Sequence, residues 1–119
     1  MKNLYTGVVQ KGTKRGHELG FPTANIIVPY MELSGIYAAR VVIEGKQYPT
    51  AVFADEKRDV LEAHILDKNL DLYGKEITIE LLQKLRDAKT FSNDEDLRAA
   101  IADDIEKVRE YFKKNPAAD

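Results

Sequence analysis

Alternation of apolar and polar residues dominates the first two thirds of the chain. Five stretches combine this alternation with β-branched and aromatic residues, a composition typical of short strands. They span residues 4–11, 35–45, 46–54, 60–67 and 75–86. Gly45 and Lys46 are expected to turn the second stretch into the third as a hairpin. Because short antiparallel strands hide their edges by closing on themselves, the pattern predicts a mainly β fold, a small closed antiparallel β-barrel.

The spacing of apolar residues along the chain changes near the C-terminus. Apolar residues recur there at intervals of three and four, which predicts one C-terminal amphipathic α-helix over about 93–114. The stripe consists of Leu97, Ile101, Ile105, Val108 and Phe112. Ser92 followed by Glu95 predicts a capping box, and the acidic first turn and the lysines of the last turn suit the helix dipole. We therefore expect the helix to pack on the barrel through this stripe, in a structural rather than a catalytic role.

Length and composition indicate one domain. With 119 residues, the chain fits a single core, with the barrel over about 4–86 and the helix behind it. No apolar run is long enough to span a bilayer and no signal-peptide core is visible, so we expect no membrane association and a cytoplasmic location. The absence of cysteine excludes disulfides and thiolate metal sites. A formal net charge of −2 argues against a general nucleic-acid binder.

The stretch LGFPTAN, residues 19–25, follows a loop rich in glycine and basic residues. Pro22 fixes its own φ and keeps the residue before it out of the helical region, so the chain enters this motif extended. Thr23 and Asn25 then point to the same side and offer a hydroxyl and an amide oxygen. Such neutral oxygen ligands suit a magnesium ion bound to nucleotide phosphates. The alternative is a tight turn whose side chains cap local backbone groups, and the pattern alone leaves both open.

A second candidate lies in the stretch VLEAHILD, residues 60–67. Glu62 and His64 are two residues apart, so in a strand they share one face at a spacing of about 6.6 Å. Their neighbours on that face are apolar, and a carboxylate there is costly unless it is paired or used. Glu62 is therefore either a general base beside a hydroxyl or a salt-bridged residue on the outer surface of the barrel. The serine-hydrolase and zinc-site patterns are absent from the sequence.

The order of these motifs resembles the riboflavin kinase (flavokinase) family. The resemblance spans about residues 5–112 and includes the glycine-rich loop, LGFPTAN, the glutamate of LEAHILD, LYG and the pattern LR…F…L…I. It implies a Greek-key barrel that transfers the γ-phosphate of ATP to the ribityl 5′-hydroxyl of riboflavin, giving FMN, with Mg²⁺. We expect small molecules as the only partners, a monomer, and a reaction that stops at FMN, since no adenylyltransferase domain precedes the barrel.

The resemblance also implies roles for individual residues. Thr23 and Asn25, with Pro22 in the same motif, are expected to contact magnesium and phosphate. Glu62 is expected to act as the base toward the ribityl hydroxyl, and Arg86 to lie at the flavin end of the site. The glycine-rich segment, which from its pattern alone is a solvated hairpin loop, is expected to cover the nucleotide. Its candidate residues are Gly12, Lys14, Arg15, Gly16 and Gly20.

The chain departs from the family pattern at one residue and in one interval. His17 stands where relatives usually have arginine. The interval 51–61 is shorter than in relatives and carries five consecutive charged residues, 55–59, which predicts a tight, charged surface turn. Flavin contact is then reduced, rearranged or lost. The alternative hypothesis is accordingly a catalytically weak or inactive module that binds a flavin or a nucleotide.

Overall fold

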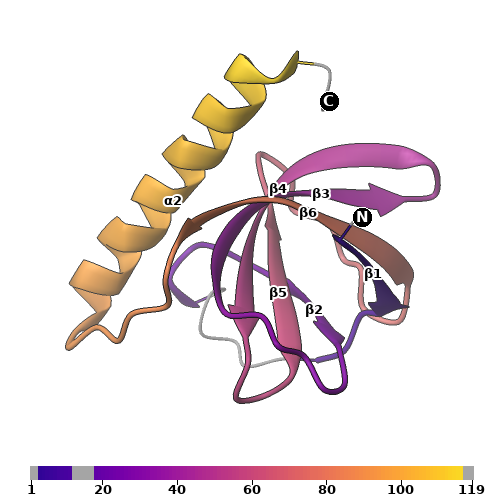
Figure 1. Ribbon diagram of the computed structural model, residues 1–119, viewed down its shortest axis with the longest axis horizontal. Coiled ribbons are helices and arrows are strands. Elements are labelled where there is room, and N and C mark those ends of the chain that lie inside the picture. The colour runs from indigo at the N-terminus through magenta and orange to yellow at the C-terminus, as the bar shows by residue number, and fades with distance from the viewer. Residues whose placement is uncertain (1–2, 12–17, 117–119) are drawn as a thin grey trace.

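The structure, a computed structural model, describes residues 3–11 and 18–116. Within these residues the chain forms six strands and a long C-terminal helix (Figure 1). The strands are β1 (Asn3–Val8), β2 (Ala24–Ile27), β3 (Gly35–Ile43), β4 (Lys46–Asp55), β5 (Val60–Ile65) and β6 (Glu76–Arg86), and the helix is α2 (Asp94–Lys114).

The strands form one antiparallel sheet in the order β1-β6-β3-β4-β5-β2. Strands β3, β4 and β5 follow one another directly, and β6 returns to pair with β3, which is the Greek-key arrangement. The sheet curls until its two edges meet, and the Gln10 N–H donates to the Asn25 carbonyl across this seam at 2.8 Å. The predicted β-barrel with a C-terminal helix is therefore confirmed, as a barrel that is nearly closed.

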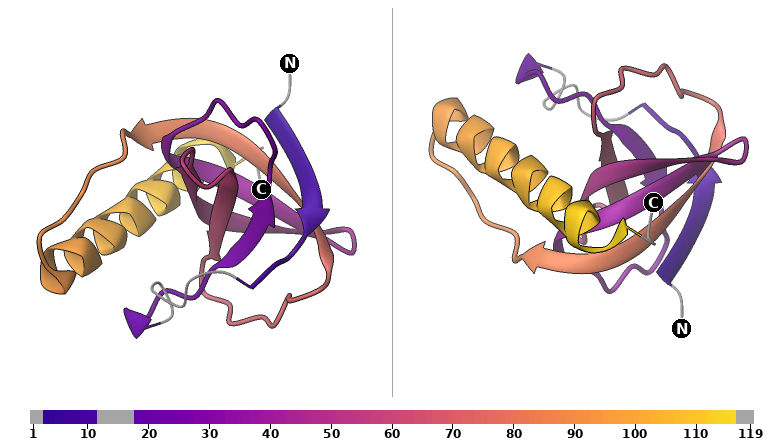
Figure 2. Two further views of the ribbon diagram at one scale, coloured as in Figure 1. Left: turned by 90° about the horizontal axis from the view of Figure 1, so that it is seen from below. Right: turned by 90° about the horizontal axis from the view of Figure 1, so that it is seen from above.

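Alternation along the strands separates two apolar cores. Inward-facing residues, among them Val41, Val52 and Leu61, fill the barrel and are fully buried. A second core lies outside the barrel wall, where α2 packs against β3 and β4 (Figure 2). Ala38 and Ala51 face the helix there, and these small side chains let it approach the sheet closely. Ile105, Val108 and Phe112 of the predicted stripe are thus buried, and Leu97 and Ile101 are partly buried.

The helix begins at Asp94, one residue later than a capping box starting at Ser92 would place it. Asn93, not Ser92, is the N-cap: its backbone is extended and its side chain accepts a hydrogen bond from the Asp96 N–H at 2.8 Å. Asn93 directly precedes the first helical residue, so its side-chain oxygen reaches the third amide of the helix. The capping-box assignment to Ser92 and Glu95 was therefore wrong. The acidic first turn and the two lysines of the last turn lie as predicted.

The β3–β4 hairpin turns one residue earlier than predicted. Ile43 pairs with Lys46, so the two turn residues are Glu44 and Gly45, both with positive φ (49° and 81°). A two-residue hairpin of this type requires positive φ at both positions, and glycine takes the second without strain. Lys46 belongs to strand β4 instead.

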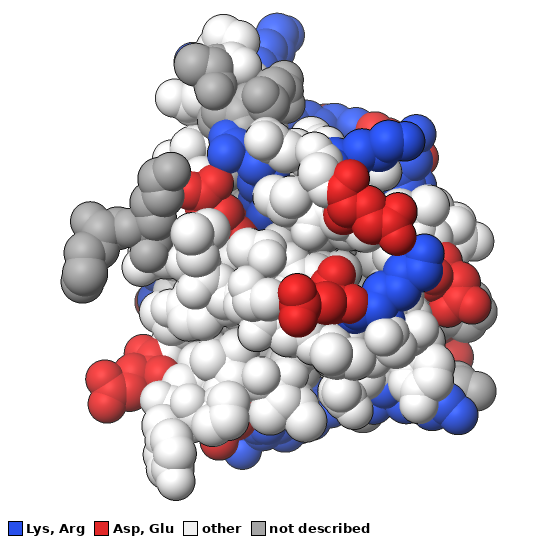
Figure 3. Space-filling view, turned by 90° about the vertical axis from the view of Figure 1, so that its right-hand side faces the viewer, with Lys and Arg blue, Asp and Glu red and all other residues white. Residues whose placement is uncertain are grey.

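The face of the barrel opposite α2 shows acidic and basic side chains beside one another, with uncharged surface between these groups (Figure 3). Strand β1 lies on this side and leaves Leu4 and Val8 about half exposed. No concentration of one charge sign is visible on this face, in keeping with the small net charge of −2.

Candidate functional site

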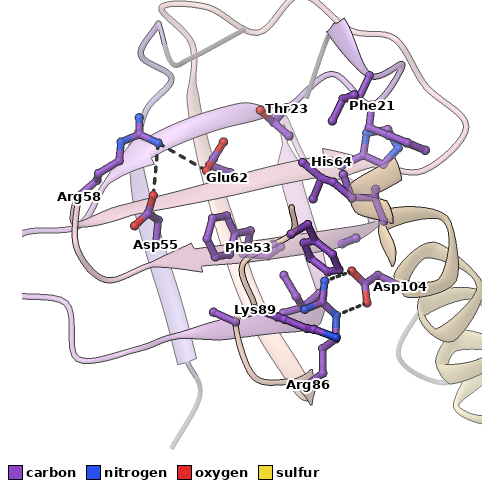
Figure 4. A pocket seen from close by; sticks show the side chains of 18 residues that line it. Phe21, Thr23, Phe53, Asp55, Arg58, Glu62, His64, Arg86, Lys89 and Asp104 are labelled. Atoms are coloured by element: carbon purple, nitrogen blue, oxygen red, sulfur yellow. Dashed lines mark hydrogen bonds and ion pairs between the residues drawn. The ribbon is translucent and has the colours of Figure 1, made fainter. Parts of the chain in front are cut away.

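A cavity of about 330 Å³ lies between the outer wall of the barrel and α2. Its walls come from the segment before β2, the outer faces of β4 and β5, the chain that follows β6, and the first half of α2 (Figure 4). The lining is largely apolar at the helix side, with Phe91, Leu97 and Ile101, and more polar at the other end, where Phe53 lies directly across from Glu62. Cavities of this size and composition are typical of small-molecule sites.

The polar end brings together the three predicted reaction-centre residues. Asn25 of β2 and Glu62 of β5 are paired directly across the two strands, so their side chains leave the sheet on the same face. The Thr23 hydroxyl donates to the Asn25 side-chain oxygen at 3.3 Å. Thr23 and Glu62 both line the cavity, and Asn25 is buried beside them. The extended PTAN segment therefore places both of its oxygen-bearing side chains next to the carboxylate.

His64 anchors this segment to β5. Its Nδ1 lies 2.8 Å from the carbonyl oxygen of Pro22, and as a ring N–H it donates to that oxygen. The Phe21 ring packs edge-to-face against the imidazole, with the ring centres 5.7 Å apart. Both contacts fix the backbone just before Thr23. The shared face that the sequence predicts for Glu62 and His64 is present, and there His64 holds the PTAN motif in place.

The pKa of Glu62 is raised above its ordinary value of 4.5. Burial in the cavity wall is the main cause; the neighbouring Arg58 lowers the pKa and Asp55 raises it. A carboxylate with a raised pKa accepts a proton more readily at neutral pH than an exposed one. This environment suits a general base.

The same raised pKa predicts a pH-dependent gain in stability for Glu62→Gln. The folded state binds a proton at Glu62 more tightly than the unfolded state, so the ionised carboxylate costs folding free energy above the folded pKa. The cost disappears as the pH falls below the ordinary value of 4.5. We expect the variant to melt a few degrees higher than the wild type at neutral pH and equally at low pH. Thermal unfolding across this range checks the expectation; equal melting temperatures at neutral pH would contradict it.

The charged turn between β4 and β5 differs in part from its prediction. It is tight, with the Arg58 N–H donating to the Asp55 carbonyl at 3.2 Å, and Glu56 and Lys57 are exposed as predicted. Asp55 and Arg58, however, line the cavity. Residues Phe53 and Asp55 alternate with inward-facing Val52 and Ala54 along β4, which turns them toward the site. The surface assignment was therefore wrong for Asp55, whose side chain is largely buried, whereas Arg58 is exposed as predicted although it also lines the cavity.

Arg86 lies at the cavity, but its donors are directed at protein groups. Its Nε and Nη2 each donate to a different carboxylate oxygen of Asp104, both at 2.8 Å, and its Nη1 donates to the Asp87 carbonyl. Asp104 is 3% exposed. This bidentate ion pair ties the end of β6 to the middle of α2. Arg86 thereby shapes the cavity wall, next to the aromatic ring of Phe91.

The sequence prediction missed several lining residues. Leu97 and Ile101, which were assigned a purely structural role, contribute to the cavity as well. Phe53 and Phe91 were not singled out. Asp104 could have been singled out from the sequence. It lies three residues after Ile101 on the apolar side of the helix, where a carboxylate needs a partner.

The predicted metal ligands are neutral. Among the described residues no group of three or more His, Cys, Asp or Glu could hold a metal ion. The adjacent oxygens of Thr23 and Asn25 fit a magnesium ion that takes its negative ligands from a polyphosphate and keeps some water. They do not form a site for a permanently bound metal.

Part of the predicted nucleotide loop lies outside the described residues: Gly12, Lys14, Arg15, Gly16 and His17. Gly20 is described and has a φ of 91°, a backbone conformation that favours glycine. It leads directly into Phe21 and the PTAN motif. Nowhere in 3–11 and 18–116 is there a helix long and apolar enough to cross a membrane.

Comparisons with known proteins find matches over almost the whole chain. The family model for riboflavin kinase (flavokinase) matches residues 2–112. A trifunctional protein RibF/MnmA of Mycoplasmoides gallisepticum is 38% identical over 91% of this chain and 18% of its own length. The bifunctional riboflavin kinase/FMN adenylyltransferase of Escherichia coli is 34% identical over 90% of this chain and 37% of its own length. The chain therefore spans less than half the length of these relatives.

A solved structure agrees as well. The crystal structure of riboflavin kinase from Trypanosoma brucei superposes with a TM-score of 0.66 at 27% identity, over 93% of this chain and 80% of that one. The family model covers almost the whole chain, including every strand of the barrel and most of α2. This chain belongs to the riboflavin kinase family.

Proposed function

We propose that the protein transfers the γ-phosphate of ATP to the ribityl 5′-hydroxyl of riboflavin and so produces FMN. The observation that carries this proposal is the pairing of Asn25 with Glu62 across β2 and β5, with Thr23 beside them, at the polar end of an otherwise apolar cavity. Family membership supports it independently.

The cavity offers a place for each end of riboflavin. The flavin ring is planar and mostly apolar, and it suits the end lined by Phe91, Leu97 and Ile101. The ribityl chain then extends toward Glu62 at the other end. Because that end is lined by polar groups, it is the part of the cavity where phosphates and a sugar alcohol are best accommodated.

Glu62 accepts the proton of the ribityl 5′-hydroxyl as its oxygen attacks the γ-phosphorus. The new oxygen–phosphorus bond forms while the bond between the γ-phosphorus and the β,γ-bridging oxygen breaks, and ADP leaves with that electron pair. Phosphoryl transfer needs alignment and charge stabilisation more than covalent participation by the protein. Thr23 and Asn25 position the nucleotide end through their oxygens. Thr23 and Asn25 would also hold a magnesium ion together with the phosphates, and that ion would supply charge neutralisation to the phosphate oxygens.

We further propose that the protein acts as a monomer in the cytoplasm, with small molecules rather than nucleic acid or membranes as its partners. The cavity is built from elements of one chain, so no second copy is needed to complete it. The substrate ATP is available in the cytoplasm.

The test is direct formation of FMN. The protein is incubated with riboflavin, ATP and magnesium, and the flavins are separated by chromatography with fluorescence detection. We expect FMN and ADP in equal amounts, and little product when magnesium is chelated. Absence of FMN from folded protein, with several nucleotides and metals, would contradict the proposal. If FMN or ADP nevertheless raised the melting temperature, the inactive binding module would be the correct description.

A further inference from the structure

Within residues 3–11 and 18–116, His64 of β5 uses one of its two ring nitrogens in a hydrogen bond. Nδ1 lies 2.8 Å from the carbonyl oxygen of Pro22. A carbonyl oxygen has no proton to give, so Nδ1 must carry the hydrogen of this bond. A neutral imidazole has one N–H and one acceptor nitrogen, and the bond to Pro22 therefore leaves Nε2 as the acceptor.

This second nitrogen is open toward the cavity. Nε2 has no hydrogen-bond partner in the part of the chain that the structure describes. It is not enclosed either, because among the same residues the one buried side-chain nitrogen or oxygen without a partner is Nε of Arg40. His64 is half-buried and lines the cavity. Its Nε2 is thus an unused acceptor that a ligand in the cavity can reach.

His64 lies between the two ends of the cavity. Glu62 precedes it by two residues on the same face of β5, at a spacing of about 6.6 Å, and both line the cavity (Figure 4). Leu66 follows His64 and belongs to the core beneath α2. On β4, Phe53 is opposite Glu62, whereas the small side chain of Ala51 is opposite His64 and leaves room beside the imidazole. A substrate that extends from the apolar end to Glu62 therefore passes alongside His64.

Most other polar side chains of the described lining already have a partner within the protein. They are Thr23, Asp55, Arg58, Glu62, Arg86 and Asp104. Lys89 remains, and its ammonium group can only donate. His64 therefore adds a neutral acceptor without a partner, and the ligand group that matches a neutral acceptor is a hydroxyl donor.

We propose that Nε2 of His64 accepts a hydrogen bond from one of the inner hydroxyls of the ribityl chain, at 2′, 3′ or 4′, and that His64 thereby selects flavins with a polyhydroxylated side chain. The inference rests on the proposed function, since riboflavin is the substrate of that reaction. With the 5′-hydroxyl at Glu62, the inner hydroxyls lie nearer the flavin ring and level with His64. An acceptor that a bound ligand leaves unpaired costs binding free energy, so such a site rejects an analogue without the hydroxyl.

The experiment compares riboflavin with a hydroxypentyl flavin, which keeps the terminal hydroxyl but lacks the three inner ones. Quenching of flavin fluorescence gives the dissociation constant of each without turnover. The wild type is expected to bind riboflavin at least about tenfold more tightly than the analogue. His64→Asn can still donate to Pro22 through its amide but has no acceptor at the place of Nε2. It should bind riboflavin about tenfold more weakly than the wild type does and the analogue equally well.

His64→Gln separates the acceptor from the contact with Pro22. Its side-chain oxygen reaches the place of Nε2, but its amide no longer meets the Pro22 carbonyl. It should restore most of the affinity for riboflavin while raising the KM for ATP, because the PTAN segment is held less firmly. Leu97→Ala, at the apolar end of the cavity, is the control and should weaken the binding of both flavins by the same factor. An equal loss for both flavins in His64→Asn, or a wild type without preference for riboflavin, would overturn the proposal.

Nitrogen-15 NMR of the histidine ring tests the acceptor directly. At mildly alkaline pH, Nδ1 of His64 should carry the proton, and riboflavin but not the hydroxypentyl flavin should shift the Nε2 resonance. A proton on Nε2 under these conditions would contradict the proposal. If the binding preference depends on His64 but the wild type makes no FMN, the proposed function fails and the role of His64 stands. If FMN forms but His64→Asn weakens both flavins equally, the role of His64 fails alone.

Discussion

Glu62→Gln is expected to lower kcat for FMN formation by a factor of about 10² to 10⁴, the usual contribution of a positioned general base. Glutamine keeps the size and shape of the side chain but cannot accept the proton of the ribityl hydroxyl. Riboflavin binding should be little changed, because the apolar end of the cavity is untouched. Rapid measurement of FMN formation gives kcat, and quenching of flavin fluorescence gives the dissociation constant.

Glu56→Gln is the control for this variant. It makes the same chemical change in the turn between β4 and β5, at an exposed position outside the cavity. Its kcat should equal that of the wild type. If Glu62→Gln kept more than about a tenth of the wild-type kcat, proton transfer to Glu62 would not be part of the rate-determining chemistry and another base would have to be sought.

The barrel was predictable because strands and helix carry different apolar periods. Alternation in 35–54 predicted the hairpin, and the three- and four-residue spacing after residue 96 predicted α2. Boundaries were less certain, since they depend on single hydrogen bonds. The N-cap is Asn93 and not the predicted Ser92, because Asn93 has the extended backbone next to the first helical residue.

The site was predictable only in part. The PTAN motif and Glu62 could be proposed from the family resemblance, but their contact depends on the β2–β5 register, which pairs Asn25 with Glu62 over a separation of more than thirty residues. Local patterns do not contain that register. The orientation of Asp55 toward the cavity depends in the same way on its place in β4, and the position of Arg58 beside it depends on how far the turn carries the chain.

The ion pair that holds α2 over the cavity gives the largest expected effect on stability. Asp104 is 3% exposed and accepts two hydrogen bonds from Arg86 at 2.8 Å. Removing one partner of a buried pair leaves the other charge without compensation, at a typical cost of 3–5 kcal/mol. Because Arg86 is partly exposed, we expect Asp104→Ala to lower the free energy of unfolding by about 3 kcal/mol, at the low end of that range.

Denaturant unfolding of Asp104→Ala checks this expectation, and the melting temperature should fall by roughly 10 °C. Asp103→Ala is the matched control, because Asp103 pairs with Lys107 on the surface of the same helix and its loss should change stability by less than about 1 kcal/mol.

The double variant Asp104→Ala with Arg86→Ala should be more stable than the sum of the two single variants predicts. Strict additivity would mean that the two groups stabilise the protein independently. In that case packing of the apolar stripe alone, without the ion pair, would hold α2 over the cavity.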